Sequence, residues 1–408
     1  MNFWLTLGIV LATYIGIALG FWPRLRANRT TITLMGAGLL IATGQIAFAD
    51  IGKFLDLDTL ILLFSMMIIN ANLRIAGFFK LAGHALLRFA RTPRALLAVL
   101  IVVTGILSAF FLNDTICLML TPLVLDLVLA MDRDPIPYLI GLATAANIGS
   151  TATLTGNPQN MIIGVASGIT YIDFAANLTP IALFGLAGIW VVVVLAYPGE
   201  FQTGAFPPSA HPAPRFHKPL LIKSLIVTAF LLAAFLAGLP IAMAAFLAAC
   251  VLLFTRRLKP EKVFAEIDWD ILVFFGALFI VTGSLEGNGI TIELFKLLTG
   301  GRELNAVSLS AITVLLSNLV SNVPAVLLLK PVVQGLVNPT AGWLTLAAAS
   351  TLAGNLTLLG SVANLIVAEI AKRRRVHLSF WEYTRTGALI TVISLVISTL
   401  WLQFVVWK

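Results

Sequence analysis

Long apolar runs, separated by short polar segments, make up most of the chain. A helix needs about 20 mostly apolar residues to cross the hydrocarbon core of a membrane. The runs are continuous rather than divided into short alternating segments, which excludes a β-barrel. The pattern predicts an all-α polytopic membrane protein with about ten transmembrane helices. The expected spans are residues 3–22, 32–49, 58–73, 137–165, 176–197, 220–238, 240–254, 269–285, 341–370 and 386–406.

Two further apolar regions, 95–130 and 304–338, are too long for a single spanning helix. Polar residues interrupt each region near its centre, with Asn113-Asp114-Thr115 in the first and Ser321-Asn322-Val323-Pro324 in the second. We expect each region to form a re-entrant helical hairpin whose polar tip lies at the middle of the membrane. The alternative is a pair of short crossing helices joined by a loop in water.

Composition and charge agree with a membrane protein. Of the 408 residues, 59% are hydrophobic and only 11% are charged, whereas soluble proteins carry about 25% charged residues. A soluble enzyme, a disordered regulator and a secreted disulfide scaffold are therefore excluded. If residues 23–29 are cytoplasmic, most of the 26 lysine and arginine residues fall on the same side. The positive-inside rule then predicts a multi-pass protein of the plasma membrane (the bacterial inner membrane) with both termini outside.

The two halves of the chain repeat each other. FLNDTICLMLTPLV at 111–124 aligns with VSNVPAVLLLKPVV at 320–333, and STATLTGNPQNMII at 150–163 aligns with GNLTLLGSVANLIV at 354–367. Because the expected topology gives the halves opposite orientations, we predict inverted repeats over 1–197 and 220–408, joined by a cytoplasmic linker at 198–219. Each repeat has three helices, a hairpin, a broken helix and a final helix. Inverted repeats with broken helices are typical of secondary transporters, whose binding sites lie at the breaks.

Breaking a helix inside the membrane frees backbone N–H and C=O groups, which is tolerated only where they line a protected cavity. The new helix N-termini carry partial positive charge and favour anions or neutral, oxygen-rich solutes. The alternative for each hydroxyl is a hydrogen bond to its own helix. The expected substrate-binding residues are Asn113, Thr115, Asn147, Ser150, Thr151, Thr153, Gly156, Asn157, Asn322, Asn355, Thr357, Gly360, Ser361 and Asn364.

Two ionisable residues are candidates for proton coupling. Asp114 lies at the first hairpin tip, where a lone carboxylate in an apolar setting is costly, so it is a candidate carrier of a proton or a cation. Lys330 occupies the position that Thr121 holds in the other repeat. It could neutralise Asp114, hold a substrate oxygen or replace a coupling cation, and the alternative is a structural ion pair between the hairpins. Asp126 is expected nearer to the cytoplasmic surface.

The motifs resemble those of a known family. Asn113-Asp114-Thr115…Thr121-Pro122, Asn147-Ile148-Gly149…Thr153-Leu154…Gly156-Asn157-Pro158…Asn160 and Asn322-Val323-Pro324 are similar to the signature segments of the ArsB/NhaD ion transporter superfamily. The resemblance covers nearly the whole chain and is closest to the ArsB-type arsenite/antimonite efflux transporters. It implies a homodimer in which a transport domain moves against a scaffold in an elevator-like manner.

The resemblance also implies a cargo, which is arsenite or antimonite exported in exchange for protons. With only Cys117 and Cys250 in the chain, capture of As(III) by three thiolates is excluded, so hydroxyls, amides and helix ends would bind it. The dicarboxylate-transporting relatives repeat a Ser-Asn-Thr tip in both hairpins. Their tip is absent here, which argues against two symmetric sodium sites.

Several alternatives stay open. The chain could be a proton- or sodium-coupled transporter of small anions such as sulfate or dicarboxylates, a sodium/proton antiporter, or a channel. An enzyme is not expected, because the sequence has neither a nucleotide-binding motif nor a metal-ligand spacing. We expect no cofactor and no metal. A cytoplasmic ATPase is a further candidate partner.

Overall fold

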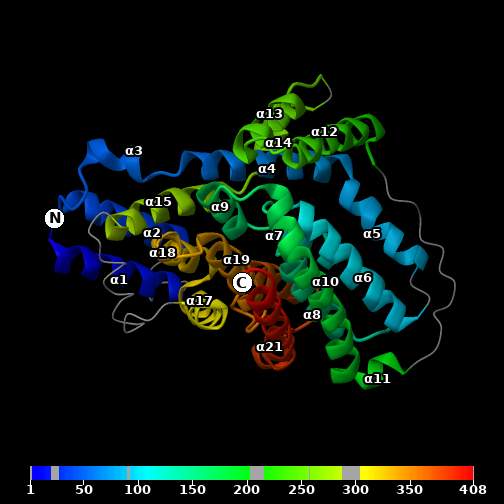
Figure 1. The fold of residues 1–408 in the computed structure, drawn as a ribbon. Helices are drawn as coiled ribbons and strands as arrows, with labels where there is room; N and C mark the ends of the chain where they lie inside the picture. Colours follow the sequence, from blue (N-terminus) through cyan, green and yellow to red (C-terminus); the bar gives the residue numbers. More distant parts are fainter. Residues whose placement is uncertain are drawn as a thin grey trace.

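The structure is a computed structural model, and it describes residues 2–19, 27–89, 92–202, 216–256, 258–286 and 304–407. All regular elements in these ranges are helices, which confirms the all-α fold class (Figure 1). Of the predicted linker at 198–219, residues 203–215 lie outside the described residues.

The first half of the chain contains a hairpin and an interrupted helix, as the sequence predicts. Its helices are α1 (Phe3–Leu19), α2 (Arg29–Ala42), η1 (Phe48–Asp50), α3 (Ile51–Phe54), α4 (Leu57–Ala76), α5 (Phe78–Phe89), α6 (Pro93–Phe110), α7 (Asn113–Ala130), α8 (Ile136–Ser150), α9 (Pro158–Ser167), α10 (Tyr171–Ala196) and α11 (Pro198–Phe201). Helices α6 and α7 form the hairpin, and the break between α8 and α9 interrupts the predicted span 137–165. The span expected at 32–49 ends earlier, at Ala42, because the chain turns at Gly44 with a φ of 69°.

The second half repeats this order. Its helices are α12 (Lys218–Leu236), α13 (Ile241–Leu253), α14 (Pro260–Phe264), α15 (Trp269–Glu286), α17 (Ala306–Val320), α18 (Asn322–Gln334), α19 (Pro339–Ala353), α20 (Val362–Arg373) and α21 (Phe380–Val405). Helices α17 and α18 meet at Ser321, which has a φ of 80°. The predicted span 341–370 is interrupted between α19 and α20. The structure therefore contains two helix pairs and two broken helices at equivalent places.

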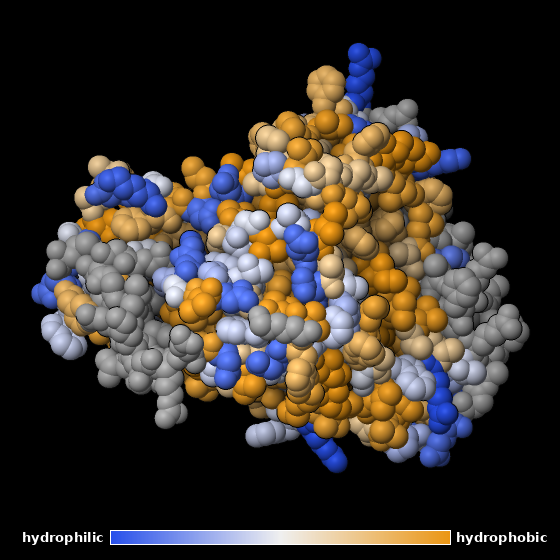
Figure 2. Space-filling model, viewed as in Figure 1, coloured by the Kyte–Doolittle hydropathy of each residue, from blue (hydrophilic) through white to orange (hydrophobic). Residues whose placement is uncertain are grey.

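Apolar side chains cover much of the outside of the molecule. Within the described ranges, six helices are each long and apolar enough to cross a membrane: α4, α6, α7, α10, α12 and α21. Phe230 on α12 and Leu195 on α10 are each 73% exposed, as expected for lipid-facing positions and not for a protein surrounded by water. Figure 2 shows hydrophobic side chains over α10 and α12, with a more polar area near α9 and α18 at the centre of the view.

The two repeats exchange packing partners. Helix α2 of the first repeat packs against α15 of the second, and α13 of the second packs against α4 of the first. In each repeat the first hairpin helix packs on the first half of that repeat's own broken helix, as α6 does on α8 and α17 on α19. The second hairpin helix contacts the broken helix of the other repeat, as α7 does with α20 and α18 with α9. This exchange brings both hairpin tips and both breaks to one central region.

Candidate functional site

Each break ends where a polar side chain caps a new helix. The Asn157 side chain accepts a hydrogen bond from the Asn160 N–H at 2.9 Å and begins α9. At the equivalent place in the second repeat, the Ser361 hydroxyl accepts from the Ala363 N–H at 3.2 Å and begins α20. Such caps satisfy backbone donors that a helix N-terminus leaves free. Both helices therefore begin inside the protein.

Two equivalent asparagines hold the extended segments in place. The Asn160 amide donates to the Ser150 and Thr153 carbonyls at 3.1 and 2.9 Å. The Asn364 amide donates to the Gly354 and Thr357 carbonyls at 2.7 and 3.1 Å. The donor and its two acceptors occupy matching positions in the two repeats. The internal symmetry found in the sequence is thus present in the hydrogen bonds.

Glycine is required at one position in each break. A Cβ atom on Gly156 would lie 2.4 Å from the Ser150 carbonyl oxygen, and one on Gly360 would lie 2.9 Å from the Gly354 carbonyl oxygen. Both distances are shorter than a van der Waals contact, and both obstacles are backbone atoms. The two glycines let the chain fold back closely against the end of the preceding helix.

The Asn147 amide, on α8, connects the first hairpin tip with the break of the second repeat. It donates to the Asn355 and Asn364 side-chain oxygens at 2.9 and 3.1 Å. Its own oxygen accepts from the Asn113 amide and the Ser361 hydroxyl, both at 3.0 Å. One side chain therefore joins the first hairpin tip to the break of the second repeat.

Most of the predicted hydroxyl ligands are hydrogen-bonded within the protein. The Ser150 and Thr151 hydroxyls donate to the Asn147 carbonyl at 2.7 and 3.4 Å, and the Thr153 hydroxyl donates to the Ala109 carbonyl. These three side chains, which the sequence could not assign to solute or to backbone, stabilise the break. The Thr357 carbonyl accepts a hydrogen bond from the Asn364 amide and so stabilises the second break.

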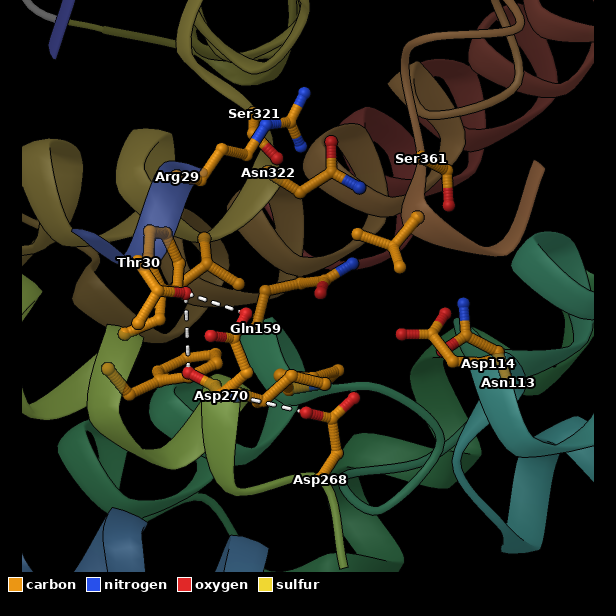
Figure 3. A pocket seen from close by; sticks show the side chains of 16 residues that line it. Arg29, Thr30, Asn113, Asp114, Gln159, Asp268, Asp270, Ser321, Asn322 and Ser361 are labelled. Carbon is orange, nitrogen blue, oxygen red and sulfur yellow. Dashed lines mark hydrogen bonds between the residues drawn. The ribbon is translucent and has the colours of Figure 1, made fainter. Parts of the chain in front are cut away.

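A central cavity of about 240 Å³ lies where the hairpin tips and breaks meet (Figure 3). The first residues of α2, α7, α9, α18 and α20 all line it, so five helix N-termini surround one space. Of the predicted site residues, Asn113, Asp114, Asn322 and Ser361 reach this cavity. Its lining residues are Arg29, Thr30, Asn113, Asp114, Pro158, Gln159, Asp268, Asp270, Ile271, Phe274, Phe275, Ser321, Asn322, Val323, Ser361 and Val362.

The two tip asparagines have unused oxygens. The side-chain oxygens of Asn113 and Asn322 are buried and have no hydrogen-bond partner among the described residues. The two residues are equivalent in the repeats, and both line the central cavity. Because an unsatisfied buried acceptor is costly, the pair indicates a ligand that donates hydrogen bonds from two sides.

Three carboxylates and one guanidinium line the central cavity. Asp270 accepts a hydrogen bond from the Thr30 hydroxyl at 2.8 Å, and Asp268 accepts one from the Ile271 N–H at 3.3 Å. The described residues offer Asp114 neither a hydrogen bond nor an ion pair. In Figure 3, Arg29 lies across the cavity from Asp114.

Sequence reasoning did not identify Arg29, Gln159, Asp268, Asp270 or Ser321 as site residues. Arg29 counted only as a cytoplasmic cation, although it lies at the start of α2. Asp268 and Asp270 flank Trp269, the first residue of α15. In the sequence they are a pair of acidic residues at the start of an apolar span, and this pattern could have identified them as site residues.

Lys330 lies away from Asp114. It lines a separate cavity of about 440 Å³ with Lys53, Asp56 and Thr282. The ion pairs between described residues do not join Lys330 to Asp114. Asp126 is exposed and pairs with Arg374.

Comparisons with known proteins agree with this architecture. Residues 14–353 match a family described as a citrate transporter, CitMHS. An uncharacterized transporter of Mycobacterium tuberculosis is 32% identical, over 94% of this chain and 95% of its own length. A silicon efflux transporter of Oryza sativa subsp. japonica is also 32% identical, over 90% of each chain.

A solved structure shares the fold. The YdaH transporter of Alcanivorax borkumensis superimposes with a TM-score of 0.56 at 16% identity, covering 98% of this chain and 97% of its own. The all-helical membrane transporter fold predicted from the sequence is therefore confirmed. The match over 14–353 and the full-length relatives show a secondary transporter rather than an enzyme. The chain belongs to the CitMHS citrate transporter family, within the ArsB/NhaD-type superfamily that its motifs resemble.

Proposed function

We propose that the protein exports a small neutral oxyacid, arsenous or antimonous acid, in exchange for protons, and that the central cavity binds it. The observation that carries this proposal is the pair of unpaired amide oxygens on Asn113 and Asn322. Arsenous acid is neutral near pH 7, and its hydroxyl groups donate hydrogen bonds to such acceptors. A carboxylate or sulfate group only accepts, so it would leave both oxygens unsatisfied.

Charge supports the same choice. The five helix N-termini each carry about half a positive charge, and the Arg29 guanidinium adds one more. Asp114, Asp268 and Asp270 oppose them. The cavity is then close to neutral overall, which suits an uncharged solute better than a tricarboxylate. Its volume of about 240 Å³ lies below the roughly 300 Å³ at which pockets for drug-sized ligands begin.

We assign proton coupling to Asp114. This carboxylate lines the central cavity next to Asn113 and has no partner among the described residues, so a proton and the solute would meet at one hairpin tip. Lys330 lines another cavity, and we do not assign it a part in the coupling. The relationship to a silicon efflux transporter supports export of an oxyacid.

A small anion is the second candidate. Arg29 and the helix N-termini are suitable for an anion, and the family is named for citrate.

The plasma-membrane orientation with both termini outside and the homodimer stay predictions from the sequence.

Transport into proteoliposomes tests the proposal. Purified protein is reconstituted, a pH gradient is imposed, and uptake of arsenite, antimonite, citrate and sulfate is measured. We expect arsenite and antimonite flux that depends on the gradient, and citrate and sulfate flux at the level of protein-free vesicles. Citrate or sulfate flux without arsenite flux would contradict the proposal.

A matched pair of variants links the flux to the cavity. Asn322→Leu removes one unpaired oxygen and should reduce arsenite flux about tenfold, the cost of one lost hydrogen bond of about 1.4 kcal/mol. Asn177→Ala, on α10 and outside the cavity, should transport like the wild type.

A further inference from the structure

A second cavity touches Asp114 from the side of α4. It measures about 360 Å³ and shares Asp114, Pro158, Asp268 and Ile271 with the central cavity. We call it the α4 cavity, and its other polar lining residues are Asn70, Arg74, Thr115 and Glu266. Asp114 and Asp268 therefore form a shared wall that both cavities reach.

Asn70 is the unusual residue of the α4 cavity. It lies in the middle of α4 and is 2% exposed, yet neither its amide oxygen nor its amide nitrogen has a hydrogen-bond partner among the described residues. Asn72, two residues further along, is also buried, and its oxygen is likewise without a partner among the described residues, but its nitrogen donates to the Ile68 carbonyl at 2.9 Å. A buried amide without partners is destabilising. Asn70 therefore indicates a ligand that satisfies both amide atoms: it accepts a hydrogen bond from the nitrogen, and it donates one to the oxygen or is a cation that the oxygen coordinates.

The charges of the α4 cavity favour a cation. Its charged residues are Asp114, Glu266, Asp268 and Arg74. Arg74 and Glu266 form an ion pair at 2.8 Å, which neutralises both. Asp114 and Asp268 remain, which also oppose the positive charge of the central cavity from their shared wall, together with the Thr115 hydroxyl and the Asn70 amide oxygen. Small hard cations bind to oxygen ligands of these kinds.

We propose that the α4 cavity contains a site for one sodium-sized monovalent cation, with Asn70, Asp114, Thr115 and Asp268 as its oxygen donors. The inference rests on the proposed function, because it gives that transporter a second ion that meets the proton carrier at Asp114. A water molecule of the bound ion accepts from the Asn70 nitrogen and satisfies the remaining donor. The site is asymmetric, since the second hairpin tip has Val323 where the first has Asp114.

Thermal unfolding of the full-length protein in detergent tests the site without any transport assay. The melting temperature Tm is measured in increasing NaCl and, at equal ionic strength, in choline chloride. We expect NaCl to raise the Tm of the wild type by about 3 °C or more, with saturation, because a ligand that binds only the folded state stabilises it. An equal Tm in both salts would mean that the site takes a proton or nothing, and would overturn the proposal.

Two leucine variants separate ligand binding from packing. Asn70→Leu should abolish the sodium-dependent rise and leave the Tm in choline chloride unchanged or higher, since it removes an unpaired amide. Asn72→Leu should lower the Tm in both salts and keep the sodium-dependent rise. Retention of the rise in Asn70→Leu would refute the assignment. If arsenite flux fails while the sodium-dependent rise persists, the cargo is wrong and the cation site stands.

Discussion

The two hairpin tips are built on the same plan but differ in charge. Each places an asparagine, Asn113 or Asn322, at the first position of a helix, with its side-chain oxygen unpaired and lining the central cavity. The next residue is Asp114 in the first tip and Val323 in the second. Each repeat therefore supplies one of the two solute contacts that we propose, while only the first tip supplies an ionisable group. The two tips are therefore alike in the asparagine that we propose as a solute contact, and they differ in the ionisable group that we assign to proton coupling.

Replacing the carboxylate should have the largest effect. Asp114→Asn keeps the shape of the tip but removes the group to which we assign proton binding and release, so flux driven by a pH gradient should fall at least a hundredfold. The measurement is arsenite uptake in proteoliposomes, with detergent-phase Tm to show that the protein is folded. Asp126→Asn, on the exposed part of the same helix, is the control and should retain most of the flux. Undiminished flux in Asp114→Asn would remove Asp114 from the mechanism.

The two breaks should differ in their tolerance of a methyl group. A Cβ atom meets the backbone at 2.4 Å in Gly156→Ala but at 2.9 Å in Gly360→Ala. Overpacking costs about 1–3 kcal/mol, and we expect Gly156→Ala near the upper end and Gly360→Ala near the lower end. Thermal unfolding of both variants checks the order. Equal destabilisation would mean that the two breaks relax alike.

Lys330 should have the smallest effect. Because Lys330 and Asp114 line different cavities, the free energies of unfolding for Lys330→Met and Asp114→Asn should add, with a coupling below about 0.5 kcal/mol in a double-mutant cycle. A double variant that is more stable than either single variant would instead show a buried pair.

The fold follows from local patterns that the sequence displays directly. The lengths of the apolar runs indicate helices, and the paired Gly and Asn motifs mark where they break, because only small or capping residues can end a helix inside a membrane. Asn113, Asn322 and Ser361 were identified as cavity residues for this reason. Each of them has an equivalent position in the other repeat, and the presence of a polar residue at both positions strengthened the prediction.

The remaining site residues depend on long-range packing. Asp268 and Asp270 reach the cavity because α15 packs against α2 of the other repeat, an exchange that no local pattern records. From the sequence alone, the Thr153 hydroxyl could donate its hydrogen bond either to a solute or to a backbone carbonyl. The fold shows that it donates to the Ala109 carbonyl. Lys330 aligns with Thr121 in the repeat comparison, yet Lys330 lines a cavity that its own helix, α18, forms with residues 53–56 and with α15.

The four hydrogen bonds of Asn147 have a thermodynamic consequence. They tie the first hairpin tip and the second break into one body, so a displacement that carries one of them carries the other without rebuilding the site between them. A carrier whose site keeps its shape during the crossing has the same intrinsic affinity for cargo on both faces of the bilayer. The direction of net movement is then decided by the combined gradients of cargo and coupling ion, and at equal cargo concentrations on both faces, reversing the ion gradient should reverse the flow.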